Sequence, residues 1–352
     1  MGRHPNGLGT PPTTTTRNAS RTAGMNHVIG VLGTGSYVPE RVVPNAEVAA
    51  PAGVDAAWIE HRTGIRLRRR AAADQATSDL AARAARRALA AAGLDASDVS
   101  LVVVATSTPD QPQPATASFV QDRIGAVQAA AVDVNAVCSG FVYALALARG
   151  HLVAEGTGGT ALVIGADVYS RILDPEDRRT AVLFGDGAGA VVLGPVARGR
   201  GLYATKLRGF GGHHDLIRVE AGGSRLPASE RTVRDGRHHF RMQGRAVREF
   251  VADAVPKLVN ELLTEHAVPA DSIGHFIPHQ ANGVMLGELS GLLSLPSATT
   301  HVNVDRLGNT GAASIPVALD EAWREDRIGS GETVLLAAFG GGMNSALALL
   351  QR

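Results

Sequence analysis

Three polar residues lie at the ends of predicted strands and helices, where folding can bring them together. Their side chains are of types that take part in catalysis. Cys138 is the only cysteine among the 352 residues and comes after the apolar run 129–134. His279 comes after a second apolar run, 273–277, and Asn309 opens a helical run rich in small residues. A cysteine with a lowered pKa is a nucleophile, a histidine moves a proton or donates a hydrogen bond, and an asparagine donates to an oxyanion. The three residues suggest nucleophilic catalysis, although structural residues also occupy strand ends.

Cys138 is expected at a turn between a strand and a helix, because a helical run at 141–152 follows it. The unpaired N–H groups and the positive end of the dipole at a helix N-terminus stabilise a thiolate. A buried structural cysteine, which behaves as a small hydrophobe, is the alternative interpretation. A metal site is not predicted, because the pairs at 213–214 and 238–239 are histidines of polar loops without close ligand spacing.

The composition excludes several classes of partner. The 34 lysines and arginines against 33 acidic residues leave a net charge of +1, so neither nucleic acid nor a membrane is expected as a partner. A single cysteine rules out an internal disulfide, which fits a reducing cytoplasm. No segment approaches the roughly 18 apolar residues of a membrane span. Residues 1–25 are polar and lack the apolar region of a secretory signal, so we expect a disordered N-terminal extension of a cytoplasmic protein.

The remaining chain alternates short apolar runs with helical runs, which predicts an α/β layered fold with largely parallel strand pairing. The glycines of 33–36 match neither a phosphate loop nor a dinucleotide fingerprint, and they indicate a turn. The basic run 66–70 is either a solvated face or part of a site for an anionic ligand. In the second case Trp58 and Arg62 could sandwich a flat ring and bind its phosphates.

Two features of the first half recur in the second half. A Phe-Gly segment precedes an apolar strand at Phe184 and at Phe339. A strand, a turn and a helix rich in small residues also recur, at Cys138 and at Asn309. An internal duplication of roughly 160 residues is therefore predicted. Equivalent helix N-termini would then face each other across a pseudo-two-fold axis, which would place Cys138 and Asn309 near one point.

Three separated motifs resemble the signature motifs of the β-ketoacyl-acyl-carrier-protein synthase III family. They are VNAVCSGF at 134–141, PHQAN at 278–282 and GNTGAAS at 308–314, in the order that the family has. Further segments similar to the family are WIEHRTGI at 58–65, FGDGAGA at 184–190 and FGGG at 339–342. The resemblance extends from about residue 28 to residue 352.

The resemblance implies an architecture and an assembly. The expected fold is the thiolase fold, a duplicated five-layer α-β-α-β-α arrangement. Its N-terminal half would span residues 26–196 and contain Cys138, and its C-terminal half would span 197–352 and contain His279 and Asn309. The family further implies a homodimer without a tightly bound cofactor, with acyl-CoA as a substrate.

The resemblance also implies the reaction. Cys138 would take the acyl group from acyl-CoA, and the backbone N–H groups of Cys138 and Gly341 would form the oxyanion hole. His279 and Asn309 would hold the thioester carbonyl of malonyl-acyl-carrier protein while it loses carbon dioxide. The enolate would attack acyl-Cys138 and give a β-ketoacyl thioester, which would prime polyketide or fatty-acid synthesis.

By the same resemblance, Trp58, Arg62 and Arg178 would bind the adenine and phosphates of CoA. Two positions of the acyl pocket differ from the family's pattern. Gln113 stands where a bulky apolar residue often reaches into the partner subunit, and Ser345 belongs to a pair that replaces a common Trp-Gly pair. Both changes suggest a pocket that is roomier or more polar, suited to an acyl group other than acetyl.

The surface that would dock the carrier protein also differs. Val284 replaces a frequent arginine and Glu249 a frequent lysine, and the nearby Arg245 and Arg248 are the candidates to compensate. An alternative function is therefore an acyltransferase that passes the acyl group from Cys138 to a hydroxyl, an amine or a carrier without condensation. A non-catalytic subunit of a synthase is disfavoured, because it would have lost reactive residues that this chain keeps.

Overall fold

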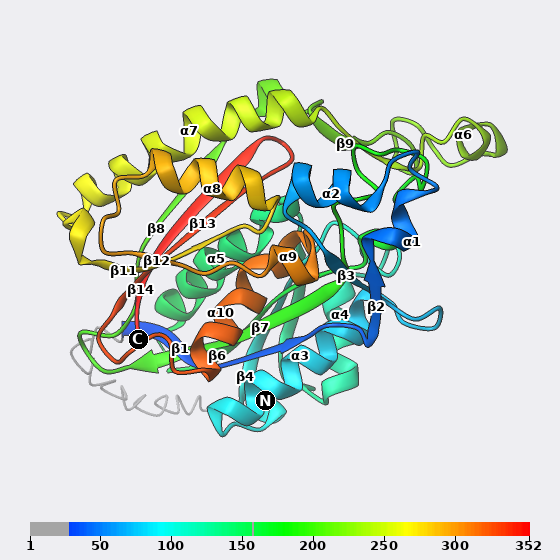
Figure 1. The fold of residues 1–352 in the computed structure, drawn as a ribbon. Helices are drawn as coiled ribbons and strands as arrows, with labels where there is room; N and C mark the ends of the chain where they lie inside the picture. Colours follow the sequence, from blue (N-terminus) through cyan, green and yellow to red (C-terminus); the bar gives the residue numbers. More distant parts are fainter. Residues whose placement is uncertain (1–27, 157) are drawn as a thin grey trace, which may run out of the picture.

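The computed structural model describes residues 28–156 and 158–352, so the predicted extension at 1–25 lies outside the described residues (Figure 1). The first half builds a five-stranded sheet in the order β1-β7-β6-β4-β5. β4 pairs in parallel with β5 and β6, whereas β7 is antiparallel to both β6 and β1. The strands of this sheet are β1 (Val28–Tyr37), β4 (Val99–Ala105), β5 (Ala130–Val134), β6 (Thr160–Asp167) and β7 (Gly187–Val196).

The second half repeats this pattern in a sheet of order β8-β14-β13-β11-β12. β11 is parallel to β12 and β13, and β14 is antiparallel to β13 and β8. The same sequence of strand directions in both sheets supports an internal duplication. It also shows that the pairing is mixed, so the expectation of largely parallel strands was wrong. These strands are β8 (Gly201–Gly209), β11 (Ile273–Pro278), β12 (Thr299–Thr300), β13 (Thr333–Gly340) and β14 (Asn344–Gln351).

The helices form three layers, one between the two sheets and one on the outer face of each sheet (Figure 1). α5 and α10 lie between the sheets, where their apolar side chains share one core with strands of both. α3 and α4 cover the outer face of the first sheet, and α7 and α8 cover the outer face of the second. The result is the five-layer arrangement that the sequence resemblance implied. The helices are α3 (Thr77–Ala92), α4 (Thr116–Ile124), α5 (Gly140–Glu155), α7 (Gly244–Glu265), α8 (Gly283–Leu292) and α10 (Ser314–Arg324).

One helical segment corrects the expectation about membrane-spanning length. Val137–Glu155 is long and apolar enough to cross a membrane by length and composition alone. Half of the window is buried, because α5 is the central helix between the two sheets. Its apolar character is explained by packing on both sides, which is the usual reason for a helix that is hydrophobic all round.

The glycines at 33–36 belong to strand β1 and do not form the predicted turn. A Cβ atom added at Gly33 would lie 2.5 Å from the backbone nitrogen of Ala92 and 2.6 Å from the carbonyl oxygen of Ala88. A Cβ at Gly35 would likewise overlap the backbone of α3. The glycines are therefore required where helix α3, itself rich in alanine, packs directly on the strand.

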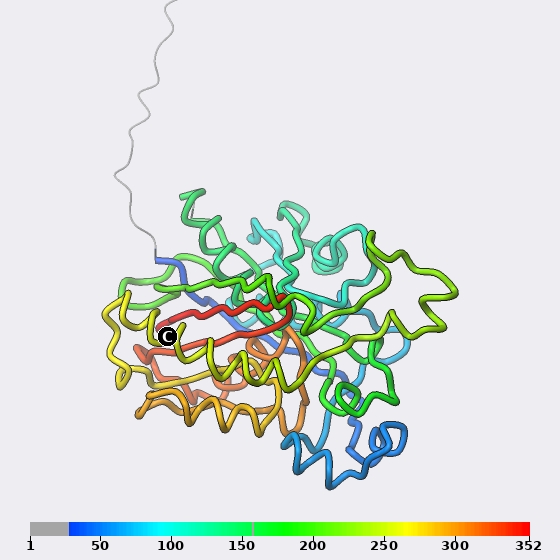
Figure 2. Tube along the Cα trace, turned by 90° about the horizontal axis from the view of Figure 1, so that it is seen from above, coloured from blue at the N-terminus to red at the C-terminus, as the bar shows by residue number. Residues whose placement is uncertain are grey.

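Smaller elements connect the layers, and the basic run belongs to one of them. Arg68 lies in β3 and is completely buried, whereas Arg66 is exposed, so the run is only in part a solvated face. The segment around α6, with the hairpin β9–β10 at its base, projects from the body of the molecule in both views (Figures 1 and 2). These elements are β2 (Arg41–Pro44), α1 (Asn45–Ala49), α2 (Ala56–Thr63), β3 (Leu67–Arg70), β9 (Ile217–Val219), α6 (Glu230–Arg234), β10 (Phe240–Met242) and α9 (Val304–Leu307).

Candidate active site

Cys138 lies at a strand-to-helix turn, as the sequence predicted. A 3₁₀ turn, Val137–Ser139, follows β5 and runs directly into α5. Val137 has a φ of 51°, which is a strained conformation for a β-branched residue. The Ser139 hydroxyl donates to the carbonyl of Asn344, 2.9 Å away, and so fixes the turn against the second half of the chain. The strained turn places the thiol at the N-terminal end of α5.

The ionisation of Cys138 differs from the expectation of a lowered pKa. The residue is 7% exposed, and its burial, together with the charge of Asp167, raises the pKa of the thiol to about 12. Hydrogen bonding from the Tyr169 hydroxyl and from the residue's own backbone N–H opposes this rise. At neutral pH the Cys138 side chain is therefore a protonated thiol, which would have to lose its proton to act as a nucleophile.

The hairpin between β13 and β14 packs directly against the turn that contains Cys138. A Cβ atom added at Gly340 would lie 2.8 Å from the backbone nitrogen of Cys138 and 3.1 Å from that of Ser139. At Gly341 it would lie 3.1 Å from a methyl group of Val137. Only glycine permits this approach, which brings the backbone of the predicted oxyanion-hole residue Gly341 beside the turn that holds Cys138.

His279 follows β11 and is held by the neighbouring strand, because its backbone N–H donates to the carbonyl of Ala337 at 2.8 Å. Its ring packs edge-on against Phe339, with centroids 5.2 Å apart. Burial lowers the pKa of His279 to about 3, so the imidazole is neutral at physiological pH. A neutral imidazole can donate one hydrogen bond to a developing oxyanion, but it is a poor base.

Asn309 is held through both of its backbone groups and its side chain. Its N–H donates to Leu183 O at 2.8 Å, and its carbonyl accepts from Gly185 N at 3.0 Å. The side-chain oxygen accepts from Gly311 N at 2.9 Å, which fixes the orientation of the amide. The amide NH₂ group is therefore the end that remains available to a ligand.

The fold brings these three residues to one place from different halves of the chain. The turn of Cys138 contacts the 3₁₀ turn Gly311–Ala313, which follows Asn309, and also the end of β13. β13 in turn holds His279 through its backbone and through Phe339. The contacts between these elements are consistent with the predicted triad, whose roles stay predictions.

Sequence reasoning missed an aromatic cluster and a buried carboxylate beside Cys138. Tyr169 stacks on Phe184 with centroids 4.4 Å apart, and Phe240 packs edge-on against both rings. Asp167, at the end of β6, is completely buried and accepts a hydrogen bond from Ala312 N at 2.8 Å. The only signal in the sequence was that an aspartate and a tyrosine follow a buried strand.

The predicted residues of the acyl pocket lie on two other elements. Ser345 lies in β14 and is buried, with no hydrogen-bond partner for its hydroxyl among the described residues. Gln113 lies on an exposed loop. The roles of both in an acyl pocket stay predictions.

The predicted CoA-binding residues lie on two elements near the site. Trp58 and Arg62 are on α2, whose C-terminal end meets the start of α8: the carbonyl of Arg62 accepts from the Asn282 side chain at 3.5 Å. Arg178 is on an exposed loop after β6. Among the residues that the structure describes, neither Arg62 nor Arg178 forms an ion pair, so both guanidinium groups are available to phosphates.

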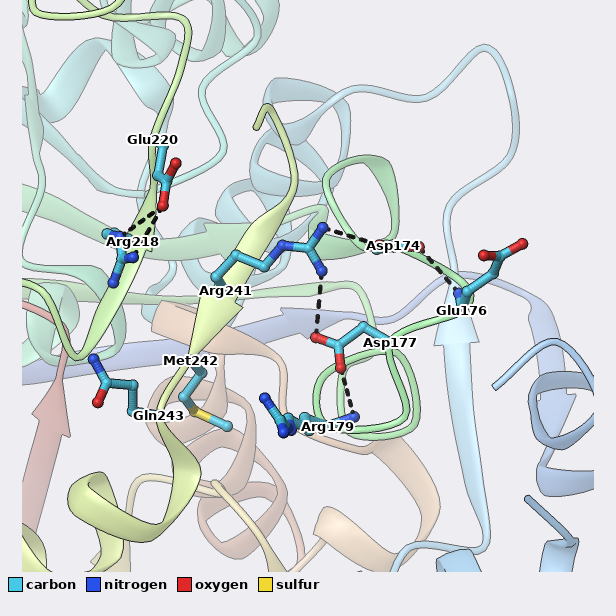
Figure 3. A pocket seen from close by; sticks show the side chains of 9 residues that line it. All are labelled: Asp174, Glu176, Asp177, Arg179, Arg218, Glu220, Arg241, Met242 and Gln243. Atoms are coloured by element: carbon cyan, nitrogen blue, oxygen red, sulfur yellow. Dashed lines mark hydrogen bonds and ion pairs between the residues drawn. The ribbon is translucent and has the colours of Figure 1, made fainter. Parts of the chain in front are cut away.

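The loop that contains Arg178 borders a cavity of about 640 Å³ (Figure 3). In Figure 3, Arg241 of β10 bridges the carboxylates of Asp174 and Asp177, at 3.0 and 3.7 Å. Arg218 is paired with Glu220 at 2.9 Å. The two ion pairs of Arg241 connect the loop to β10, which also contains Phe240 of the aromatic cluster. The cavity is lined by Asp174, Glu176, Asp177, Arg179, Arg218, Glu220, Arg241, Met242 and Gln243.

The surface that would dock a carrier protein is neutralised. Arg245 pairs with Glu249 at 2.9 Å, and Arg248 forms a two-pronged ion pair with Glu288, one contact of which is 2.7 Å. Val284 is exposed beside them on α8. The two arginines that were expected to compensate for Glu249 are therefore engaged by acidic neighbours.

No group of three or more His, Cys, Asp or Glu side chains within 28–156 and 158–352 could hold a metal ion.

Comparison with known proteins identifies the family of this chain. The family model described as "3-Oxoacyl-[acyl-carrier-protein (ACP)] synthase III" matches residues 132–211, and the model of its C-terminal domain matches 263–352. The chain is 57% identical to acetoacetyl CoA synthase NphT7 of Streptomyces sp. (strain CL190), over 91% of this chain and 98% of that protein. It is 44% identical to β-ketoacyl-[acyl-carrier-protein] synthase III of Clostridioides difficile (strain 630), over 91% and 97%.

A solved structure shares the fold. The β-ketoacyl-[acyl carrier protein] synthase III of Thermus thermophilus superimposes with a TM-score of 0.84 at 39% identity, covering 92% of this chain and 99% of that one. The thiolase fold and the condensing type of acyltransferase follow from these similarities together. The chain thus belongs to the β-ketoacyl-[acyl-carrier-protein] synthase III family, whose members make β-ketoacyl thioesters by decarboxylative condensation.

Proposed function

We propose that this enzyme transfers a small acyl group, with acetyl as the first choice, from CoA to Cys138 and condenses it with malonyl-CoA. The observation that supports this acceptor most directly is the neutralised docking surface, where Arg245 and Arg248 are paired with Glu249 and Glu288. An acidic carrier protein would need free cations there. The similarity to a protein named acetoacetyl CoA synthase points to the same pair of substrates.

In the first half-reaction the sulfur of Cys138 attacks the acyl-CoA carbonyl. A bond forms between this sulfur and the acyl carbon, the bond from that carbon to the CoA sulfur breaks, and CoA leaves as a thiol. The N–H groups of Cys138 and Gly341 are the proposed donors to the carbonyl oxygen, which becomes negatively charged in the tetrahedral intermediate. Trp58, Arg62 and Arg178 are the proposed contacts of the CoA adenine and phosphates.

In the second half-reaction His279 and Asn309 are the proposed donors to the malonyl thioester oxygen. As the carboxylate leaves as carbon dioxide, its electron pair moves into the thioester and forms an enolate. The two hydrogen bonds strengthen as charge develops, and one such donor is worth about 3–4 kcal/mol of barrier. The enolate carbon then attacks acyl-Cys138 and releases a β-ketoacyl thioester together with the cysteine thiolate.

The choice of a small acyl group rests on the aromatic cluster. Tyr169 lies against the Cys138 thiol, and Phe184 and Phe240 pack behind it with centroid distances of 4.4 to 5.4 Å. Rigid rings that already contact one another leave little room for additional methylene groups. Gln113 and Ser345 remain the proposed contacts from the loop and from β14.

The homodimer and the cellular setting are part of the same proposal. β5 is an edge strand of the first sheet, and Val132 on it is 46% exposed, so a second copy can cover an otherwise unpaired apolar edge. We propose that the enzyme works in the cytoplasm without a resident cofactor, and that it supplies starter units for fatty-acid or polyketide synthesis.

The test supplies acetyl-CoA with either malonyl-CoA or malonyl-acyl-carrier protein and measures carbon dioxide release and product mass. Acetoacetyl-CoA formed from malonyl-CoA, at a rate that the carrier protein does not exceed, is the expected result. The Cys138→Ala variant is the control and should form no acyl-enzyme. Turnover with only the carrier-bound malonyl group would refute the acceptor. Acyl transfer without carbon dioxide release would support the non-condensing alternative. A panel of longer acyl-CoA donors tests the pocket in the same assay.

A further inference from the structure

The reaction requires a proton acceptor for the Cys138 thiol, and the proposed triad does not contain a good one. Burial holds the thiol in its protonated form, with a pKa of about 12. The neighbouring His279 has a pKa of about 3, so it has little tendency to take the proton. Yet Cys138 must react as a thiolate, because the thiol itself is a weak nucleophile.

A chain of hydroxyl groups leads from Cys138 to a buried carboxylate. Hydrogen bonding by the Tyr169 hydroxyl opposes the rise in the pKa of the Cys138 thiol that burial causes, so the two groups are neighbours. It lies 2.8 Å from the Ser107 hydroxyl, which in turn lies 3.1 Å from Asp167 Oδ1. Tyr169 and Asp167 are 1% and 0% exposed, and Ser107 between them is half-buried.

The direction of this chain follows from the chemistry of its last member. An ionised carboxylate only accepts hydrogen bonds, so Ser107 must donate its hydroxyl proton to Asp167. The Ser107 oxygen is then an acceptor, and the Tyr169 hydroxyl donates to it. The tyrosine oxygen is left to accept from the S–H group of Cys138. Every proton in the chain therefore points towards Asp167.

From this geometry we infer that Tyr169 is a catalytic residue that relays the Cys138 proton through Ser107 to Asp167. Each proton moves one step along its hydrogen bond: from sulfur to the tyrosine oxygen, from tyrosine to serine, and from serine to the carboxylate. The product is a Cys138 thiolate that accepts a hydrogen bond from Tyr169, and a protonated Asp167. When the acyl group has moved, the CoA sulfur beside Cys138 takes the proton back along the chain, so none is gained or lost.

The surroundings of Asp167 fit this role. Its Oδ1 also accepts from Ser107 N at 2.9 Å, Thr108 N at 3.1 Å and the Thr106 and Thr108 hydroxyls, so the carboxylate stays fixed. Burial nevertheless raises its pKa, which favours uptake of a proton. The ionisable groups that act on Cys138 are Asp167 and Tyr169, and the nearby His279 is neutral.

The relay is tested with Tyr169→Phe, Ser107→Ala and the double variant. Phenylalanine keeps the packing on Phe184 and Phe240, and Ser107→Ala keeps the backbone bond to Asp167. The measurement is the rate at which iodoacetamide alkylates Cys138 between pH 6 and 10, read by intact mass. Each single variant should slow alkylation at pH 7 by about tenfold, equivalent to a rise of one unit in the thiol pKa. Because both residues belong to one chain, the double variant should be no slower than the slower single variant.

The control is Tyr203→Phe, a half-buried tyrosine on β8 outside the site, which should alkylate at the wild-type rate. A Ser107→Ala enzyme with the wild-type rate, or additive losses in the double variant, would overturn the relay. The inference rests on the proposed role of Cys138, but alkylation needs no acyl-CoA. A Cys138→Ala enzyme that still acylates would instead refute the nucleophile, so the two failures can be told apart.

Discussion

At the scale of single residues, the two proposed oxyanion donors are neutral, and the amide of Asn309 is held in a fixed orientation. Asn309 is fixed through Leu183, Gly185 and Gly311, and His279 is kept neutral by burial. Donors that need no reorientation stabilise an oxyanion at little cost during the reaction. The same burial keeps Cys138 protonated, so the nucleophile is generated only when its proton has an acceptor.

The Asn309→Ala substitution tests whether Asn309 acts in decarboxylation but not in the acylation of Cys138. Removing one donor to the enolate oxygen should lower the rate of malonyl-CoA decarboxylation by about 10²–10³-fold. Acylation of Cys138 should change much less, because its oxyanion is assigned to the backbone N–H groups of Cys138 and Gly341. Carbon dioxide release and intact mass after acetyl-CoA exposure measure the two steps. Equal losses in both would contradict the separate roles.

At the scale of elements, Arg68 of β3 anchors the segment that holds Asn309, the proposed donor to the enolate. The Arg68 guanidinium donates to Val182 O at 2.7 Å and to Asn45 Oδ1 at 2.8 Å. The segment that begins at Val182 binds both backbone groups of Asn309. Burial lowers the pKa of Arg68 to about 10, so the group remains charged at neutral pH. We therefore expect Arg68 to be a positioning residue that acts through this segment.

The Arg68→Met variant should lose decarboxylation more strongly than acylation, because the segment that holds Asn309 loses its anchor. We expect about 1–3 kcal/mol of destabilisation from the carbonyl and amide oxygens that are left without a donor. Arg66→Met is the matched control, since Arg66 forms only an exposed side-chain ion pair with Asp305. Both half-reactions are measured at a temperature where urea unfolding shows all variants folded. A uniform loss would indicate a purely structural role.

The contact between β1 and α3 gives a prediction about stability alone. Gly33→Ala places a methyl group 2.5 Å from the backbone nitrogen of Ala92, and the helix must move to admit it. We expect a loss of about 1–3 kcal/mol of unfolding free energy. Gly150→Ala is the opposite control, because Gly150 is exposed on α5 with no neighbouring atom within 4 Å. It should stabilise the protein by about 0.5–1 kcal/mol. Urea unfolding of the two variants decides whether close packing explains the glycine at 33.

At the scale of the whole molecule, buried histidines make stability depend on pH. Burial lowers the pKa of His279 to about 3 and that of His301 to about 4, below the ordinary value of 6.5. The unfolded chain therefore binds protons between pH 6.5 and 4 that the folded chain does not. The contribution of these two histidines to the free energy of unfolding is fully present above pH 6.5. It is lost as the pH falls through this window.

The expected slope is at most about 1.4 kcal/mol per pH unit for each histidine. Urea unfolding of the wild type at pH 7.5, 6.5, 5.5 and 4.5 should show the decline. A His301→Gln variant should show a shallower one, because one of the two groups is removed. A free energy of unfolding that stays constant from pH 7.5 to 5 would contradict the prediction.

The sequence by itself indicated most of the elements and the candidates for the reactive residues. The apolar run 129–134 and the helical run 141–152 placed Cys138 between a strand and a helix, because local periodicity records secondary structure. The repeated strand, turn and helix pattern indicated the duplication. The motifs around Cys138, His279 and Asn309 were contiguous in the chain, and contiguous patterns can be read without a fold.

The tertiary structure alone decided how those residues ionise and what surrounds them. The high pKa of Cys138, the burial of Arg68 and the packing of Gly33 each depend on atoms that are distant in sequence. Phe240 reaches the site from a hairpin of the other half, and Asp167 bonds to Ala312 across the two halves. Desolvation and hydrogen bonding act through space, whereas a sequence pattern records only neighbours along the chain, so these properties appeared only when the two halves were packed together.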